Sequence, residues 1–345
     1  MPAQDTPPPA STSRRTGTGR RQILTLIVLF VLGDWLGAGL AVYFAVAARR
    51  GQSLEHLFSG WTWWVIALTV LVVLWYGRGV RRLAREFRGV PLTAQFLVYL
   101  GIFTAFVAVV PPLDTVARDL YFVHQIQHML LHMIAPLLLA LGVPLAPLIA
   151  GLPSVLRRNV LKPLVRNRAL QWLWRLLVHP LAASLLFTFA LYFWQIPHFM
   201  DLIALSDPLD EFAHATMLIS GLFFWWMLFD PRPRPNAVSY PTRLLCVTVT
   251  MFACILADAY VVFTQRQLYP VYANLASAWG FSPRLDQTLG GLITWIDGSM
   301  TLVIGALIVF HRWVRDETLR PLSRRRRLLR MQLPDPMLES ASQPQ

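Results

Sequence analysis

Long apolar runs separated by short polar segments recur along most of this chain. Eight of them approach or exceed the length of about 20 residues that an α-helix needs to cross a bilayer. They occupy residues 23–48, 61–76, 92–110, 121–141, 181–197, 212–229, 244–263 and 289–310, the second and fifth being short. The pattern predicts an all-α fold, a polytopic membrane bundle of about eight transmembrane helices.

The segments on either side of the apolar region predict the domain organisation. Residues 1–22 are rich in Pro, Ser, Thr and Gly, a composition typical of a disordered tail, and this tail is basic. The transmembrane domain is expected at 23–311, followed by a basic tail at 312–345. The first apolar run is longer than a signal-peptide core and has no clear cleavage site, so we expect it to be retained as a span.

Composition supports a membrane protein. Only 14% of the 345 residues are charged and the mean hydropathy is +0.49, whereas about 25% of residues are charged in a soluble domain. The net charge of +13 would suggest a nucleic-acid partner in a soluble protein. Here the basic residues flank apolar runs, so membrane orientation explains them and no nucleic acid is expected. Cys246 and Cys254 form no disulfide or metal-binding motif and are expected to be small buried apolar residues.

The basic residues also predict the orientation in the membrane. Lys and Arg gather in alternate connections, at 77–91, 142–180 and 230–243, and in the two tails. The remaining connections carry few basic residues and several acidic ones. Because basic loops stay on the cytoplasmic side, both termini are expected to be cytoplasmic.

One span stands out by its histidines. His124, His128 and His132 lie in the apolar run 121–141 at a spacing of four residues. On an α-helix this spacing makes a polar stripe roughly 12 Å long on one side. Such a stripe is costly against lipid, so it should face other helices. It is expected to meet a metal, a haem, a proton path or a hydrogen-bonding neighbour.

The predicted orientation places further polar residues at the same depth as this stripe. His214 falls in the first turn of the sixth run, Asp258 in the outer half of the seventh, and Asp286 at the outer mouth of the eighth. Most of the histidines therefore belong to the outer side of the membrane, and we expect a polar site there.

Three kinds of chemistry fit this set of side chains. Imidazoles with nearby thioethers, such as Met129, Met133 and Met217, suit copper, because Met favours Cu(I) and His accepts either oxidation state. Zinc accepts His and Asp, and a haem could be held by histidines on facing helices. No nucleotide-binding, metalloprotease or nucleophile–base motif is found, so the chain is not expected to be an enzyme.

Several segments resemble the CtaG-type (multi-span) cytochrome c oxidase assembly factors. They are HQIQHMLLHMIAPLLLALGVPLAP at 124–147, HP at 179–180, WQIPHFMD at 194–201, AHATMLISGLFFWW at 213–226 and LDQTLGGLITW at 285–295. The resemblance covers residues 95–312 or so. It implies a multi-pass protein of the bacterial plasma membrane that is needed for active haem–copper oxidase and supplies or inserts copper.

The resemblance also implies which residues carry this role. It transfers to His124, His128, His214 and Asp286, which match the family pattern. Two positions depart from it: Gln195 stands where many members have histidine, and His132 stands where an apolar residue is common. One outer histidine has thus been exchanged for another.

The sequence as a whole predicts an outer-facing copper site in a membrane assembly factor. His124 and His128 are the primary ligand candidates, His132 and His214 the next, and Asp286 a carboxylate beside the site or at its mouth. The expected partners are oxidase subunits or other assembly factors, the copper ion and the lipid bilayer. Two alternatives stay open, a bis-histidine haem b redox protein and a transporter of copper or protons, as does the choice between copper storage, insertion and transport.

Overall fold

The computed structural model describes residues 25, 27–40, 42–43, 63–232 and 237–332, with side chains described as far as residue 318. Every regular element in these ranges is a helix, so the predicted all-α fold is confirmed. After the helix Ile27–Leu40 come α2 (Trp63–Arg85), α3 (Leu92–Ala108), α4 (Leu113–Ala117), α5 (Tyr121–Met129), the π-helical turn η2 (Leu130–Ile134), α6 (Ala135–Gly142), α7 (Leu145–Gly151), α8 (Ser154–Leu156), a second π-helical turn η3 (Arg157–Leu161) and α9 (Lys162–Arg166). The second half contains α10 (Arg168–Leu177), α11 (Pro180–Gln195), α12 (Pro197–Leu205), α13 (Asp207–Phe229), α14 (Tyr240–Phe263), α15 (Pro270–Ala278) and α16 (Pro283–Gln332).

Several of these helices have the dimensions of membrane spans. In the described ranges, five are long and apolar enough: α2, the continuous run Tyr121–Gly142, α13, α14 and the part Pro283–Thr318 of α16. Together α10 and α11 qualify as a sixth, bent by 68° at the break between them. The helices Ile27–Leu40 and α3 are apolar but shorter. Each of the eight predicted runs overlaps one of these helices, while the count of eight complete spans stays a prediction.

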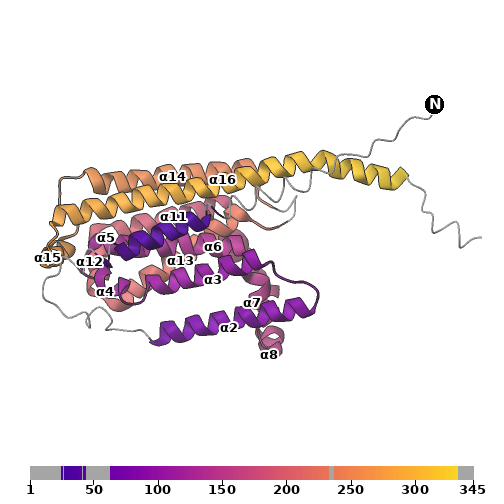
Figure 1. Cartoon of the computed structure of the whole chain (residues 1–345), viewed down its shortest axis with the longest axis horizontal. Helices are drawn as coiled ribbons and strands as arrows, with labels where there is room; N and C mark the ends of the chain where they lie inside the picture. The colour runs from indigo at the N-terminus through magenta and orange to yellow at the C-terminus, as the bar shows by residue number, and fades with distance from the viewer. Residues whose placement is uncertain (1–24, 26, 41, 44–62, 233–236, 333–345) are drawn as a thin grey trace, which may run out of the picture.

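The two predicted tails lie largely outside the described part of the chain. Residues 1–22 and 333–345 lie outside the described residues. The helix α16 continues without interruption past residue 311, so the predicted C-terminal tail begins inside a helix of 50 residues. Figure 1 shows this helix extending well beyond the bundle.

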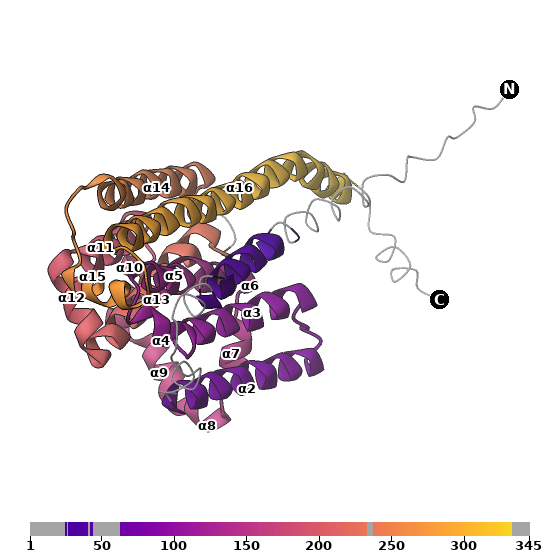
Figure 2. The ribbon, with the colours of Figure 1, turned by 60° about the vertical axis from the view of Figure 1, so that its left-hand side comes forward.

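The histidine-bearing helix forms the centre of the bundle. In the run Tyr121–Gly142, 89% of the most apolar stretch is buried, against 17% for α2 and 33% for α14. Helices α3, α13 and α16 pack around it, and α14 packs outside α16 (Figures 1 and 2). A helix covered on all sides by protein can carry polar side chains inside a membrane, because none of them faces lipid.

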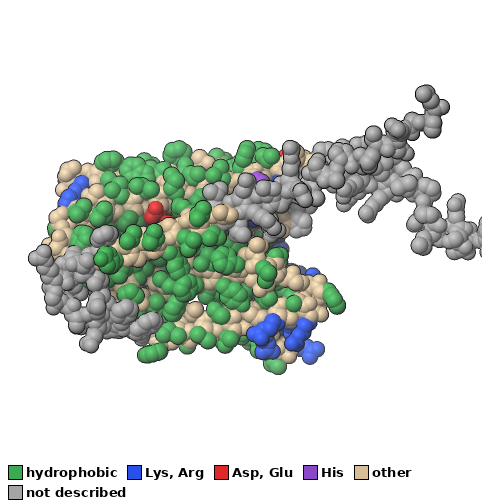
Figure 3. Space-filling model, in the orientation of Figure 1, with side chains coloured by type: hydrophobic (Ala, Val, Ile, Leu, Met, Phe, Trp, Pro, Cys, Tyr) green, Lys and Arg blue, Asp and Glu red, His purple; other side chains and the backbone are tan. Residues whose placement is uncertain are grey.

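The outer helices show the opposite arrangement, with an apolar outer face. On α14, exposed apolar residues recur every three or four positions while the inner stripe is buried. Figure 3 shows apolar side chains over most of the visible surface. A soluble protein rarely exposes so much continuous apolar surface, which supports a bundle surrounded by lipid. The exposed residues of α14 are Leu245, Val249, Phe252, Leu256, Tyr260 and Phe263.

Basic connections gather at the end of the bundle opposite α15. Arg312 donates a hydrogen bond to the Phe229 carbonyl at the end of α13 (3.2 Å). Gly79 lies against Gly151, which brings the Arg-rich end of α2 beside α7. Figure 3 shows a cluster of basic side chains at the lower right. This cluster agrees with the charge pattern that predicted cytoplasmic termini, and the side of the membrane stays a prediction.

A close approach between two backbones fixes the position of α13. A Cβ atom at Gly221 would lie only 2.5 Å from the carbonyl oxygen of His132, so only glycine fits there without a shift. His214 lies seven residues earlier on α13, about two turns along the same face. The contact at Gly221 therefore places His214 opposite the N-terminal part of the central helix.

We predict that Gly221→Ala destabilises the protein, because the added methyl pushes α13 away from the backbone of His132. Overpacking of this kind costs about 1–3 kcal/mol, which should lower the Tm of the detergent-purified chain. Gly298→Ala is the matched control, since a Cβ atom there meets its nearest neighbour at an ordinary 3.6 Å. Equal Tm values for the two variants would contradict the close approach.

Candidate metal centre

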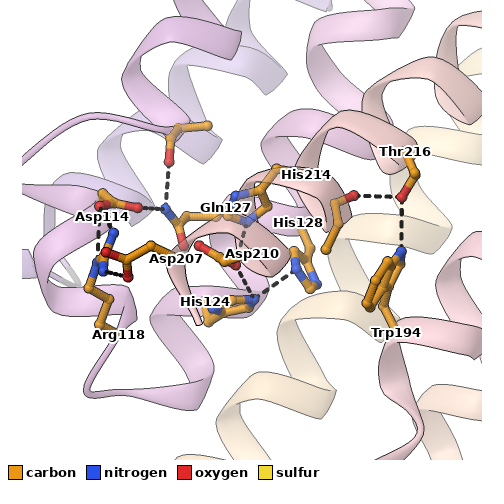
Figure 4. Close-up of polar contacts among 12 residues, drawn as sticks. Asp114, Arg118, His124, Gln127, His128, Trp194, Asp207, Asp210, His214 and Thr216 are labelled. Atoms are coloured by element: carbon orange, nitrogen blue, oxygen red, sulfur yellow. Dashed lines mark hydrogen bonds and ion pairs between the residues drawn. The ribbon is translucent and has the colours of Figure 1, made fainter. Parts of the chain in front are cut away.

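Three of the predicted site histidines converge in the structure. His124 and His128 come from α5 and His214 comes from α13, with 2%, 1% and 5% of their surfaces exposed. One ring nitrogen from each lies within 4.8 Å of the others, an arrangement that could hold a metal ion. Figure 4 shows the three rings directed toward a common region between the two helices.

The rings contact one another directly. The Nε2 atoms of His124 and His128 lie 2.8 Å apart, at hydrogen-bond distance. The ring centroids of His214 lie 5.5 Å from His124 and 5.4 Å from His128. The spacing of four residues on α5 thus puts two imidazoles side by side, and α13 supplies the third.

A carboxylate missing from the sequence prediction completes this group. Asp210 Oδ1 lies 3.6 Å from His214 Nε2 and 3.9 Å from His124 Nε2. Asp210 is one helical turn before His214, so both side chains project from the same face of α13. That i, i+4 spacing was visible in the sequence and could have identified it.

A tyrosine from a connecting helix contacts the centre from the other side. The Tyr272 hydroxyl lies 3.1 Å from His124 Nδ1. Burial, and then the nearby carboxylates of Asp210 and Asp286, raise the pKa of Tyr272 well above its ordinary value, so the phenol stays neutral. A partner on Nδ1 holds the ring so that Nε2 faces the centre. No sequence pattern pointed to Tyr272, because it lies 148 positions from His124.

Several buried polar atoms of this centre make no hydrogen bond. Within the described part of the chain, His128 Nδ1, His214 Nε2 and Asp210 Oδ1 make no hydrogen bond although they are inaccessible to solvent. Buried polar groups in native proteins are nearly always satisfied, and exceptions often mark an ion or a water site. A cation between these donors would satisfy His214 and Asp210, so the residues present fit a metal ion.

His132 does not join this group. Its ring packs on Phe187 of α11, with centroids 3.9 Å apart, and its Nε2 lies 3.4 Å from the Ser220 hydroxyl. It sits in η2, where the wider i→i+5 hydrogen-bonding pattern changes the rotation per residue. His132 thus still faces α13 at Ser220, but about one turn further along the central helix than His128 and away from His124 and His214.

Asp286 supports the centre from a different position. It lies near the start of α16, and its two oxygens accept hydrogen bonds from the backbone N–H groups of Tyr121 and Phe122, both at 3.0 Å. These are free donors in the first turn of α5, where a negative charge is also favourable. In this structure Asp286 fixes the beginning of the helix that carries His124 and His128.

The methionines predicted to lie near the imidazoles are not all directed at the centre. Met129 and Met133 reach toward α16, where their methyl groups lie 3.6 and 3.7 Å from the Cβ position of Gly298. Met217 is fully buried in an apolar cluster with Tyr121, Met200 and Tyr272. Met129 and Met133 are therefore directed to α16, and the imidazoles and the Asp210 carboxylate are the groups that lie close together at the centre.

A charged network lies at the same end of the bundle as the centre. Arg118 forms ion pairs with Asp114 (3.2 Å) and with Asp207. Asp114 also accepts a hydrogen bond from Gln127 of α5 (3.2 Å). Figure 4 shows this network beside the histidines. It ties α4 to α5 and to the start of α13, the two helices that provide the ligand candidates.

The fold and this centre define a class: a helical bundle with several spans and a buried three-histidine site near one end. The profile of the cytochrome c oxidase caa3 assembly factor (Caa3_CtaG) family matches residues 74–316, so the chain belongs to that family.

Relatives from mycobacteria show a more distant similarity. The chain is 26% identical over 204 residues to uncharacterised proteins of Mycobacterium bovis and Mycobacterium tuberculosis, and 25% identical over 209 residues to one of Mycobacterium leprae. These matches cover 57–59% of this chain and only 30–31% of the relatives, so the chain corresponds to about a third of their length. No solved structure matches it.

We predict that Asp286→Ala lowers stability more than Asp286→Asn does. Alanine leaves two buried N–H groups of α5 without acceptors, and each unsatisfied group costs about 1–3 kcal/mol. Asparagine keeps one carbonyl oxygen that can accept. Thermal unfolding of the purified variants checks the order. If the two substitutions lower the Tm equally, the backbone contacts of Asp286 are not the source of its effect.

Proposed function

We propose that this chain takes part in the assembly of cytochrome c oxidase by holding a copper ion at His124, His128 and His214. Asp210 would be a fourth donor. The observation that carries the proposal is the convergence of three buried imidazoles within 4.8 Å. The role in oxidase assembly comes from the family, whose members are cytochrome c oxidase caa3 assembly factors. The proposed role is binding and delivery rather than catalysis.

Copper is favoured among the metals by two arguments. Imidazole accepts copper in either oxidation state, and binds it more strongly than the other divalent first-row metals. The oxidase that the family serves contains copper, so a copper carrier fits the process. Zinc would also accept three histidines and a carboxylate. Loading the purified protein with either metal compares the two directly.

The arrangement of the rings favours an ion over a haem. A bis-histidine haem lies between its two ligands, which face each other across the porphyrin. Here His124 and His128 are in contact at 2.8 Å. A porphyrin held by His128 and His214 would need the space between these two rings. The His124 ring lies in that space, with its centroid 4.3 Å from that of His128 and 5.5 Å from that of His214.

We also propose an orientation of the chain in the bacterial plasma membrane. Eight spans with both termini cytoplasmic would put the histidine centre in the outer half of the bacterial plasma membrane. Copper would then be passed on at the outer surface to an oxidase subunit or another assembly factor. The cluster of basic side chains at the lower right of Figure 3, at the end of the bundle opposite α15, supports this orientation.

A transporter is the second candidate, and one cavity favours it. A space of about 500 Å³ lies between the helix Ile27–Leu40, the central helix and α16. Asp34, Asp297 and Met129 line it together with apolar side chains. Ionisable residues inside a membrane often mark an ion path. Copper uptake into proteoliposomes that is lost in Asp297→Asn would favour transport over delivery.

We predict that the detergent-purified chain binds about one copper ion and that His128→Ala does not retain it through desalting, because only two of the three imidazoles, with the Asp210 carboxylate, remain. His198→Ala is the control, since His198 is an exposed residue of α12 outside the centre. Metal content after loading with copper or zinc and desalting is the measurement. Copper retained by His128→Ala, or lost from His198→Ala, would contradict the proposed ligands.

We also predict that Tyr272→Phe and Asp210→Asn weaken copper binding without abolishing it. Loss of a group that orients a ligand typically costs 10–100-fold in metal affinity, about the range expected for Tyr272. A competition titration with a copper chelator measures this, and an absorption spectrum of the same samples should show no Soret band. A Soret band in wild type that disappears in His128→Ala would establish the haem alternative.

A further inference from the structure

A basic helical segment lies on the outside of the bundle, far from the histidine centre in sequence. Residues 154–177 form α8, η3, α9 and α10, and none of their side chains is buried in the structure. The segment contains no Asp or Glu. Its basic residues are Arg157, Arg158, Lys162, Arg166, Arg168 and Arg175. The described part of the chain therefore supplies neither an apolar cover nor an internal counter-charge for this segment.

The last helix of the segment, α10, is amphipathic. Arg168, Gln171 and Arg175 follow one another at steps of three and four residues, so they share one face. The opposite face carries leucines that remain 37%, 41% and 44% exposed, namely Leu170, Leu173 and Leu176. A basic face opposed to an apolar one is typical of a helix that lies in the plane of a membrane surface.

The direction of α10 agrees with such a position. It is bent by 68° from α11 at the break between them. A helix at this angle to one that crosses the membrane runs nearly along the membrane surface. Trp174 of α10 packs against Phe223 and Trp226 of α13, with ring centroids 5.9 and 6.4 Å apart. Both partners lie within two turns of the end of α13, so α10 is level with the end of a candidate span.

A second basic group approaches the same segment from α2. A Cβ atom at Gly79 of α2 would clash with the carbonyl of Pro147, and one at Gly151 would clash with the carbonyl of Trp75. The backbones of α2 and α7 therefore touch. Arg157 follows Gly151 by six residues, which span at most about 22 Å. The arginines that surround an open space of about 510 Å³ beside this crossing are Arg78, Arg81, Arg82 and Arg85.

The two basic groups have little opposite charge around them. Arg82 pairs with Glu86 at 3.4 Å, and both side chains are largely exposed. The other basic residues of the two groups form no ion pair with a described carboxylate. Arg157, Arg158 and Lys162 line a further space of about 420 Å³. Like charges gathered in this way favour an anion, and arginine matches phosphate oxygens in charge and geometry.

We propose that residues 154–177, together with the arginines of α2, bind anionic phospholipids of the bilayer. The phosphate groups meet the basic side chains, and the acyl chains cover the leucines of α10. A free phosphate ion would balance the charges and leave the apolar face exposed, whereas a lipid satisfies both. Basic recesses at the cytoplasmic ends of membrane helices are suited to anionic headgroups. This binding is independent of the histidine centre and of copper.

The test titrates the full-length, detergent-purified chain with phosphatidylglycerol, phosphatidylcholine or inorganic phosphate and records the Tm. A ligand that binds the folded state raises the Tm. Phosphatidylglycerol is expected to raise it by several degrees, and the other two are not. No shift with phosphatidylglycerol, or an equal shift with phosphatidylcholine, would overturn the proposal. An equal shift with inorganic phosphate would identify a free-anion site and would also overturn it.

A triple variant tests whether the segment carries the response. Arg157→Gln, Arg158→Gln and Lys162→Gln together remove three exposed charges. Each basic residue at an anionic surface contributes about fivefold to affinity, so the titration should shift by about 100-fold. The matched control removes three charges from the arginine run 324–327, through Arg324→Gln, Arg325→Gln and Arg326→Gln, and should respond as wild type does. An equal loss in both variants would show a general effect of net charge and contradict the site.

A substitution on the apolar face separates lipid binding from charge alone. Leu173→Ser leaves every basic residue in place and alters a side chain that packs little within the protein. It should weaken the response to phosphatidylglycerol, because the acyl chains lose part of their contact. A titration identical to that of wild type would show that lipid does not cover this face of α10.

Discussion

The burial of one polar helix inside an apolar bundle is the constraint on which the rest of this structure depends. The run Tyr121–Gly142 carries imidazoles and amides that lipid would not tolerate, and 89% of its most apolar stretch is covered by protein. The surrounding helices provide this cover, and they expose apolar outer faces of their own. The histidine centre therefore lies on the least lipid-exposed helix of the described bundle.

Two local features convert this burial into a specific site. The close contact of Gly221 with His132 sets the height of α13, so that His214 and Asp210 meet His124. The π-helical turn η2 carries His132 one turn further along, where its ring meets Phe187 of α11 and Ser220 of α13. π-helical turns of this kind often occur at functional sites.

A buried polar contact also joins the helices around the start of α5. The Gln195 amide of α11 donates a hydrogen bond to Asp258 of α14. The Tyr269 hydroxyl donates to the Gln195 carbonyl, and the Tyr269 ring stacks on Tyr121 in the first turn of α5. Together with the contacts of Asp286, these interactions fix the beginning of the helix that carries His124 and His128.

The sequence alone determined the class of fold, the positions of the apolar helices, and the helix that matters most. These follow from residue periodicity and burial cost, which are local properties of the chain: the four-residue spacing of His124 and His128 was enough to place them side by side. Tertiary packing decided which other groups join them. Tyr272 reaches His124 from a short connecting helix, His132 meets Phe187 and Ser220 instead of the other histidines, and Asp286 accepts hydrogen bonds from the backbone of α5. Each of these depends on contacts between segments far apart in the chain, which no local pattern of residues encodes.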